Sequence, residues 1–169
     1  MDKLTKIING RKELNRLIGL LCLFILGINS VSAQYCSSGA VSTADEDIAS
    51  VYLKGNTVTL NNVSSTPTCQ LYTDWTGLTP VDLSAGRSYT ITIVESTCNG
   101  HYTYACNAWI DYNQNNTFES WEAVSPVSQS KNGAGASFTY TWKVPCNITP
   151  GKTRMRVVMI EGPVNNPGS

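Results

Sequence analysis

The chain has 169 residues, and its 12 basic and 12 acidic side chains give a formal net charge of zero. Five of the basic and two of the acidic residues fall within residues 1–33, so residues 34–169 carry seven basic and ten acidic groups, a net charge of −3. No basic patch or basic helix remains in that part, which argues against nucleic acid as a partner. Its length is enough for one domain with a hydrophobic core.

The N-terminal segment has the pattern of a secretory signal peptide. A basic leader precedes the apolar run Leu17–Ile28, and the segment 31–33 offers small residues before a cleavage site. The run is close to the length of a signal-peptide core and too short to span a bilayer; an uncleaved membrane anchor is the alternative. We predict a signal peptide over residues 1–33 and a mature chain from Gln34, secreted to the extracellular space or cell surface, with no membrane span after signal removal. The leader's basic residues are Lys3, Lys6, Arg11, Lys12 and Arg16.

The rest of the chain is dominated by strand patterns. Apolar and polar residues alternate in several short segments, and turn-forming residues separate these segments. About seven such segments predict an all-β fold, an antiparallel β-sandwich with an EF-hand-like calcium loop inserted after a strand. The exception is Thr43–Ser50, where a capping threonine and three acidic residues favour a short helix. The predicted strands are Ala49–Lys54, Thr57–Asn62, Thr68–Asp74, Arg87–Glu95, Tyr102–Asp111, Ala136–Val144 and Thr153–Ile160.

Residues Asp111–Glu122 have the ligand spacing of an EF-hand calcium loop. Oxygen-bearing side chains occupy loop positions 1, 3, 5, 9 and 12, and calcium takes about 6–8 oxygen ligands at such spacing. Position 6 requires a positive φ, and Asn116 stands there as the residue most tolerant of it after glycine. The predicted calcium ligands are the side chains of Asp111, Asn113 and Asn115, the carbonyl of Thr117, Glu119 directly or through water, and both carboxylate oxygens of Glu122.

The loop departs from the EF-hand pattern in two ways. Asparagines replace carboxylates at positions 3 and 5, and a predicted strand, not a helix, precedes the loop. The expected calcium affinity is therefore weak, on the order of 10⁻⁴–10⁻³ M. The alternative is an Asn-rich hairpin turn held by its own side-chain hydrogen bonds.

The cysteines agree with export. Residues 34–169 contain five cysteines and no Cys-x-x-Cys pair that would suggest zinc. In an exported protein such cysteines normally form disulfides. We predict that Cys69, Cys98, Cys106 and Cys146 are disulfide-bonded, with the connectivity open.

Catalytic constellations are missing from the sequence. His101 is the only histidine, so a His-Glu-x-x-His zinc site cannot form. The sequence also has no Gly-x-Ser-x-Gly elbow for a serine triad, and we expect His101 to be a histidine of a surface turn beside Asn99-Gly100. Carboxylates for glycoside hydrolysis are available in Asp45-Glu46-Asp47 and Asp74. The three consecutive acids fit a helix start or a second cation site equally well. We therefore expect that the chain is not an enzyme.

Several aromatic residues could form a platform for stacking sugars. Aromatic pairs across strands are also ordinary sheet stabilisation, so the pattern does not decide between the two. Trp109 and Trp142 are assigned to the core, because they stand in the middle of alternating runs. The candidate platform residues are Tyr72, Trp75, Tyr102, Tyr104, Tyr112 and Trp121.

Six motifs follow one another along the chain: Tyr35-Cys36-Ser37-Ser38-Gly39, Ser42–Ile48, Tyr72–Thr76, Leu83–Gly86 with Ser88-Tyr89, Trp109–Gln114 and Thr153–Val157. In this order they resemble the GEVED domain family, a group of non-catalytic β-sandwich modules in secreted bacterial proteins. The resemblance covers nearly all of residues 34–169. It implies that the domain is C-terminally incomplete, because the family's acidic terminal segment would begin just after Ser169. That segment would supply a last strand and a partner for the odd cysteine, for which we take Cys36.

The resemblance implies a function that involves no catalysis. We expect a secreted, calcium-stabilised binding or adhesion module of a bacterial extracellular or cell-surface protein. One alternative is an accessory domain of a secreted metallopeptidase or other hydrolase whose catalytic part is not in this chain. A second alternative is a carbohydrate-binding module. The expected partners are an extracellular protein or glycan ligand and other domains of a longer parent chain.

Overall fold

Antiparallel strands are the main regular structure of the described chain, which comprises residues 35–36, 40, 42, 44–63, 69–100, 102–125, 129–133 and 135–162 of a computed structural model. Contacts divide the chain into the units Met1–Gln34 and Tyr35–Ser169, and every described residue belongs to the second unit. The predicted signal peptide and His101 lie outside the described residues.

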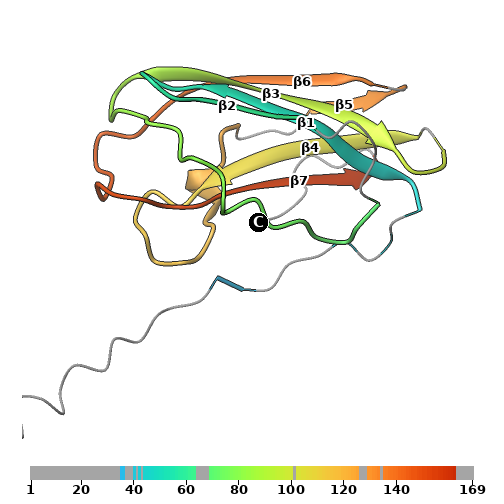
Figure 1. Cartoon of the computed structure of the whole chain (residues 1–169), viewed down its shortest axis with the longest axis horizontal. Coiled ribbons are helices and arrows are strands. Elements are labelled where there is room, and N and C mark those ends of the chain that lie inside the picture. The colour runs from blue at the N-terminus through green and yellow to red at the C-terminus, as the bar shows by residue number, and fades with distance from the viewer. Residues whose placement is uncertain are drawn as a thin grey trace, which may run out of the picture. The chain divides into compact units, whose positions relative to one another are not determined.

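The strands form two sheets that lie in two layers (Figure 1). Strands β1 (Glu46–Lys54), β2 (Thr59–Val63), β3 (Ser88–Thr97) and β6 (Ser137–Lys143) form a four-stranded sheet in the order β2-β1-β3-β6. Strands β4 (Thr103–Ile110), β5 (Gln129–Asn132) and β7 (Met155–Glu161) form a three-stranded sheet in the order β5-β4-β7. All pairings are antiparallel, which confirms the predicted fold class. A single 3-10 turn, η1 (Ser120–Glu122), follows β4.

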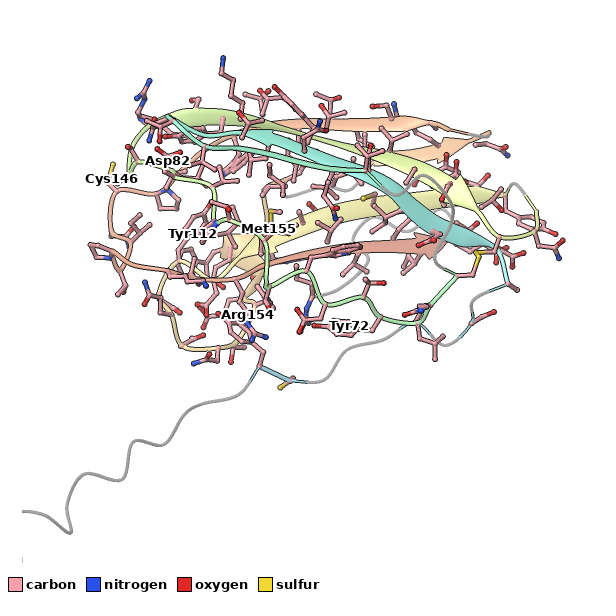
Figure 2. All side chains as sticks on the ribbon, in the orientation of Figure 1. Tyr72, Asp82, Tyr112, Cys146, Arg154 and Met155 are labelled. Carbon is pink, nitrogen blue, oxygen red and sulfur yellow. A yellow bond between two sulfur atoms is a disulfide. The ribbon has the colours of Figure 1, made fainter. Side chains whose placement is uncertain are left out.

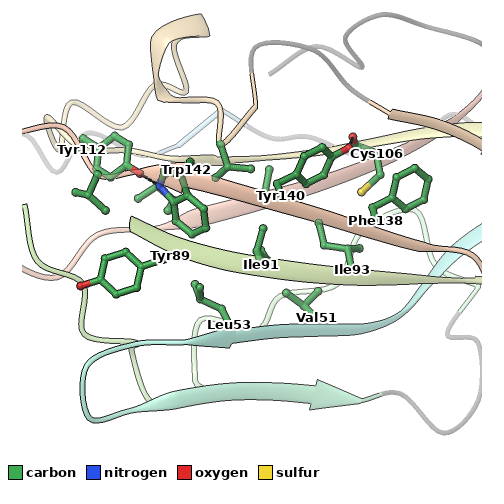
Figure 3. Close-up of a cluster of buried hydrophobic side chains, with 14 of the residues drawn as sticks. Val51, Leu53, Tyr89, Ile91, Ile93, Cys106, Tyr112, Phe138, Tyr140 and Trp142 are labelled. Carbon is green, nitrogen blue, oxygen red and sulfur yellow. Dashed lines mark hydrogen bonds between the residues drawn. The ribbon is translucent and has the colours of Figure 1, made fainter. Parts of the chain in front are cut away.

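The core lies between the two layers and follows the period-2 pattern of the strands. On β3, Ile91 and Ile93 are fully buried, and they lie opposite Tyr140 and Phe138 of β6. These side chains point into one cluster with residues of β1 and β4 (Figure 3). Burying a side chain of this size stabilises the fold by about 1.5–3 kcal/mol, so this cluster is the main source of stability. Its burial confirms the assignment of Trp142 to the core.

Strand β4 is buried on both faces, which explains why its residues are mostly apolar or aromatic. One face belongs to the inter-sheet core, and the chain that follows the strand covers the other. Val124 donates its N–H to the carbonyl of Ala108, and the Asn107 amide donates to the carbonyl of Ser125. Trp109 is fully buried on this second face, as predicted. Because β4 is enclosed, the loop at its C-terminal end starts from a rigid position.

Three predictions for individual elements were wrong. The segment Thr43–Ser50 does not form a helix over its described residues: Glu46–Ser50 belong to β1, where β3 offers hydrogen-bonding partners that outweigh the local capping signals. Residues 69–74 of the predicted strand Thr68–Asp74 are not a strand, and Leu71 and Tyr72 are half exposed. Strand β5 was missed, because its sequence Gln-Ser-Lys-Asn has no apolar residue.

The disulfide prediction is confirmed in part. Cys69 and Cys98 are bonded, with sulfur atoms 2.09 Å apart. The predicted bonding of Cys106 and Cys146 is wrong: both are free thiols, as is Cys36. Cys106 lies on β4 with its side chain in the core beside Phe138 (Figure 3), whereas Cys146 is exposed beyond the end of β6. The two positions are therefore unsuited to a common bridge.

The three free thiols should differ in reactivity. Burial raises the pKa of the Cys106 thiol far above its ordinary value, and thiolates, not thiols, react with alkylating reagents. In the native chain we expect iodoacetamide to modify Cys36 and Cys146 and to leave Cys106 unmodified until denaturant is added. Peptide mass mapping before and after unfolding measures this. Native labelling of Cys106 at the rate of the exposed cysteines would contradict its buried position.

Candidate metal centre

The loop Asp111–Glu122 begins where β4 ends and is held at its base by the chain that leads into β7. Asp111 donates its N–H to the carbonyl of Arg154 at 3.1 Å, and its own carbonyl accepts the hydroxyl of Thr153 at 2.5 Å. Thr149 donates its N–H to the carbonyl of Tyr112 at 2.8 Å. The Tyr112 hydroxyl also accepts the indole N–H of Trp142, which ties the loop to the core (Figure 3). The loop's first residues are therefore fixed in place.

The carboxylate of Asp111 lies at the centre of the loop. The Asp111 side chain is fully buried, and its two oxygens accept the N–H groups of Asn115 at 3.2 Å and Asn116 at 3.0 Å. These bonds wrap the backbone around the carboxylate, as expected for position 1 of a calcium loop. Asn116 has φ 66°, which confirms the positive φ expected at position 6. Gln114 also has a positive φ, 58°, which the sequence analysis did not predict.

The two predicted asparagine ligands shape the middle of the loop. Asn113 Oδ1 accepts the N–H of Asn115 at 3.0 Å, and Asn115 Oδ1 accepts the N–H of Thr117 at 2.8 Å. Such bonds two residues along the chain are Asx turns, the feature that defines the alternative hairpin interpretation. Each amide oxygen has a second lone pair, so these bonds leave one acceptor site per oxygen. Thr117 is exposed at the rim of the loop.

Glu122 closes the loop with both of its oxygens. Oε1 accepts the N–H groups of Tyr112 at 2.8 Å and Asn113 at 3.4 Å, and Oε2 accepts the N–H of Glu119 at 3.0 Å. Glu119 and Glu122 also form a reciprocal capping box around η1. Although it lies in a surface loop, Glu122 is fully buried. The residue predicted to bind with both oxygens therefore has both oxygens turned inward, toward the start of the loop.

Glu119 occupies a more external position than the other carboxylates. Its Oε2 accepts the side-chain amide of Asn113 at 2.8 Å and the indole N–H of Trp121 at 2.7 Å. Among the described residues, the carboxylates of Asp111, Glu119 and Glu122 do not all lie within 4.8 Å of one another. Glu119 would have to rotate to bind an ion directly, or bind through water, the two options that the sequence analysis left open.

The electrostatics of the loop favour a positive charge. Burial raises the pKa of Glu122, and the nearby charge of Asp111 adds to this effect; hydrogen bonds from the backbone of Glu119, Tyr112 and Asn113 oppose it. In the described part of the chain, no ion pair joins Asp111 or Glu122 to a basic side chain. Two buried carboxylates close together are unfavourable unless a cation neutralises them. Their remaining lone pairs and the asparagine oxygens are the hard donors that calcium prefers.

A group of residues far from the loop completes it, and the sequence analysis missed their role. The Tyr35 hydroxyl donates to Asp111 Oδ2 at 2.5 Å, and its ring lies against that of Phe118 with centroids 5.2 Å apart. Arg154 stacks over the Tyr35 ring and Arg156 over the Phe118 ring, at 4.8 and 4.5 Å. Burial, followed by the hydrogen bond to Asp111, raises the pKa of Tyr35. The loop is thus flanked by two cationic groups that face aromatic rings.

A second acidic group lies in the same unit. Carboxylate oxygens of Asp45, Glu46 and Glu161 lie within 4.8 Å of one another. Asp47 is not part of this group, because its carboxylate accepts the N–H groups of Ile48 and Cys69. The carboxylates of Asp45-Glu46-Asp47, which the sequence offered as a second cation site, therefore point in different directions. Only those of Asp45 and Glu46 lie beside Glu161.

The predicted aromatic platform is wrong as a single surface. Tyr104 is fully buried and Tyr112 is 5% exposed, so neither can stack on a ligand. The other four platform residues, Tyr72, Trp75, Tyr102 and Trp121, are each about half exposed. Tyr72 and Trp75 lie in the long connection between β2 and β3, on which Figure 2 labels Tyr72, whereas Trp121 belongs to the loop Asp111–Glu122.

Comparison with known proteins finds one family model that matches the C-terminal part of the chain. The model of the GEVED domain matches residues 105–169, which include most of β4, the whole loop Asp111–Glu122 and β7. This confirms the resemblance seen in the sequence for those residues. No curated protein and no solved structure matches the chain. No helix of the described residues is long and apolar enough to cross a membrane.

Proposed function

Starting from the GEVED domain that occupies residues 105–169, which indicates a bacterial extracellular module, we propose that this chain is a non-catalytic, calcium-stabilised binding or adhesion module. The proposal places one calcium ion in the loop Asp111–Glu122. It assigns no reaction to the chain, in keeping with the lack of a catalytic motif in the sequence. The Cys69–Cys98 disulfide is compatible with an extracellular location.

The observation that carries the calcium assignment is the pair of fully buried carboxylates in a surface loop. Asp111 and Glu122 organise the loop backbone from its two ends, and each accepts N–H groups from the other parts of the loop. A hairpin turn held only by Asx bonds has no need for two buried acids, because neutral side chains accept the same bonds without the desolvation penalty. Calcium would supply the positive charge and hold oxygens from loop positions 1, 3, 5 and 12 around itself.

A terbium assay tests the metal site directly. Terbium replaces calcium in oxygen-rich sites and emits when an excited tryptophan lies close to it. The indole N–H of Trp121 touches the Glu119 carboxylate, and its ring lies 6.2 Å from that of Tyr112. We therefore expect excitation of tryptophan to produce terbium emission that saturates with added terbium and is displaced by calcium.

Two variants serve as controls for this assay. Trp121→Phe should lower the sensitised emission while calcium binding, measured by calorimetry, persists. Glu122→Gln should weaken both signals at least tenfold, because it removes a ligand oxygen and a negative charge. No calcium binding by calorimetry in folded protein, together with terbium emission unaffected by Glu122→Gln, would exclude this loop as the site.

A further inference from the structure

A groove lies on the outer face of the four-stranded sheet and is lined by residues of β1 and β3 and of the turns beside them. Figure 1 shows the position of these two strands in the sheet. The groove has a volume of about 480 Å³. Ligand sites commonly have volumes of about 300–1,000 Å³, and this groove is partly open to solvent. Its shape suits a chain that lies across the surface better than a small molecule held in a pocket. It is lined by Tyr52, Lys54, Gly55, Asn56, Arg87, Ser88, Tyr89, Thr90 and Thr92.

The floor of the groove is a regular array of hydroxyl groups. Thr90 and Thr92 of β3 point outward and lie opposite Thr141 and Thr139 of β6. The Thr90 and Thr141 hydroxyls are hydrogen-bonded at 2.8 Å, and those of Thr92 and Thr139 are 3.5 Å apart. Each hydroxyl has one donor and two acceptor sites, so the array retains free sites toward solvent. Residues 88–92 extend over about 13 Å of strand, the length of a short stretch of polysaccharide.

An aromatic ring stands beside this array. Tyr52 of β1 lies opposite Thr92 in the register and is 42% exposed. Exposed tyrosine offers a flat apolar face and a polar edge, a combination that contacts the face of a sugar ring while its hydroxyl stays hydrated. The row across the sheet therefore consists of the aromatic side chain of Tyr52 on β1 and threonine side chains on β3 and β6.

The charge of the groove is positive, although residues 34–169 carry a net charge of −3. Lys54 and Arg87 line it, none of its lining residues is acidic, and Lys143 lies opposite Ser88 at the same end. All three basic side chains are exposed. They come from separate strands, which is why the sequence showed no basic patch. An anionic ligand complements this charge.

One of the cationic groups is held in place. Arg87 Nη1 donates to Asn56 Oδ1 at 2.8 Å, and the Tyr89 hydroxyl donates to the same oxygen at 3.0 Å. Asn56 is itself fixed, because its amide donates to the carbonyl of Asp82 and the hydroxyl of Ser84. The Asp82 carboxylate is engaged elsewhere, with the N–H groups of Thr57 and Val58. A guanidinium held in this way loses less entropy when it binds an anion.

We propose that this groove binds an anionic polysaccharide, with Lys54, Arg87 and Lys143 facing its carboxylate or sulfate groups, Tyr52 stacking on a sugar ring, and the threonine hydroxyls bonding its hydroxyls. This assignment rests on the proposed function, because it names the ligand of a binding module. Nucleic acid is the competing polyanion. Three cations and a single exposed aromatic ring fit a sparsely charged sugar chain better than a phosphate backbone with one charge per nucleotide.

Three polymers with one backbone test the proposal: dextran, carboxymethyl-dextran and dextran sulfate. Binding of the exported chain is measured by affinity electrophoresis and by calorimetry in calcium-containing buffer. We expect binding to one or both anionic polymers and at least tenfold weaker binding to dextran. The two anionic polymers separate recognition of carboxylates from recognition of sulfates. Equal affinity for dextran, or no binding to any of the three, would overturn the assignment.

Variants locate the site and separate it from general charge attraction. The double variant Lys54→Ala/Arg87→Ala should weaken binding about tenfold or more. Lys152→Ala/Lys131→Ala removes the same charge outside the groove and should change binding less than twofold. Tyr52→Ala should weaken binding to the glycan several-fold and leave any binding of double-stranded DNA unchanged. Equal losses in the two double variants, or tighter binding of DNA than of the anionic dextrans, would count against a glycan groove.

The outcome of the polysaccharide-binding experiments does not depend on the calcium site. The groove lies on the four-stranded sheet, and none of its lining residues belongs to the loop Asp111–Glu122. Calcium stabilisation without glycan binding would refute only the ligand assignment. Glycan binding by a chain that neither binds calcium nor is stabilised by it would refute only the metal site.

Discussion

The folded chain should unfold at a higher temperature in calcium than in chelator, by roughly 10 °C when calcium is 100-fold above its Kd. An ion that binds only the folded loop adds about 2.7 kcal/mol to the free energy of unfolding at that concentration, and for a domain of this size such a gain raises Tm by roughly that amount. With a Kd of about 10⁻⁴ M, the condition is met in about 10 mM calcium. Thermal unfolding followed by circular dichroism measures the shift.

The variants Asp111→Asn and Glu122→Gln should lose most of this calcium-dependent shift. Each removes one of the two buried charges that the ion would neutralise. Asp74→Asn is the matched control, because Asp74 is an exposed acid outside the loop whose carboxylate accepts the N–H of Thr76 at 2.8 Å. Because the shift is a difference within one variant, any change in basal stability cancels. Identical melting curves for the folded wild-type chain with and without calcium would refute the metal site.

Replacing the disulfide by Cys69→Ser/Cys98→Ser should lower the free energy of unfolding by about 3.5 kcal/mol. The bridge closes a loop with a sequence separation of 29, and this value follows from the entropy that such a closure removes from the unfolded chain. The closed loop comprises β3 and residues 69–87 of the long connection between β2 and β3, and these connecting residues have no regular structure. Urea unfolding of the variant and of the wild type measures the difference.

Reductant provides the control for this experiment. It should destabilise the wild-type chain to the level of the double serine variant and have no effect on the variant itself. The variant Cys146→Ser should unfold like the wild type in the absence of reductant, because Cys146 is exposed and unbonded. Equal stability of wild type and double serine variant would mean that the bridge does not constrain the unfolded chain.

The sequence predicted those strands that have one face in the core and the other face in solvent. In β6, Phe138, Tyr140 and Trp142 face the core while Thr139 and Thr141 face solvent, so the period-2 pattern is complete. The pattern fails at an edge strand such as β5, where backbone pairing with β4 holds four polar residues in place. It also fails for Thr68–Asp74, where apolar residues are exposed in a connection held by a disulfide.

The candidate site likewise has one part that the sequence predicts and one part that it does not. The ligand spacing from Asp111 to Glu122 is local, so the sequence was sufficient to predict the loop and the positive φ at Asn116. The contacts of Tyr35 and Arg154 are not local, and no periodicity connects residues so far apart. The cationic end of the groove depends likewise on the register between β3 and β6, which places Ser88 beside Lys143.

The contact of Tyr35 with Asp111 bears on the order in which the domain can form. The two residues are 76 positions apart, and the carbonyl of Cys36 accepts a bond from Arg156, 120 positions away. A chain that leaves the cell N-terminus first has Tyr35 outside well before Arg156 emerges. Contacts over such separations form late, because the intervening chain must be ordered first. The contact of Tyr35 with Asp111 would therefore be among the last to form, after the loop Asp111–Glu122, whose own hydrogen bonds join residues close in the sequence.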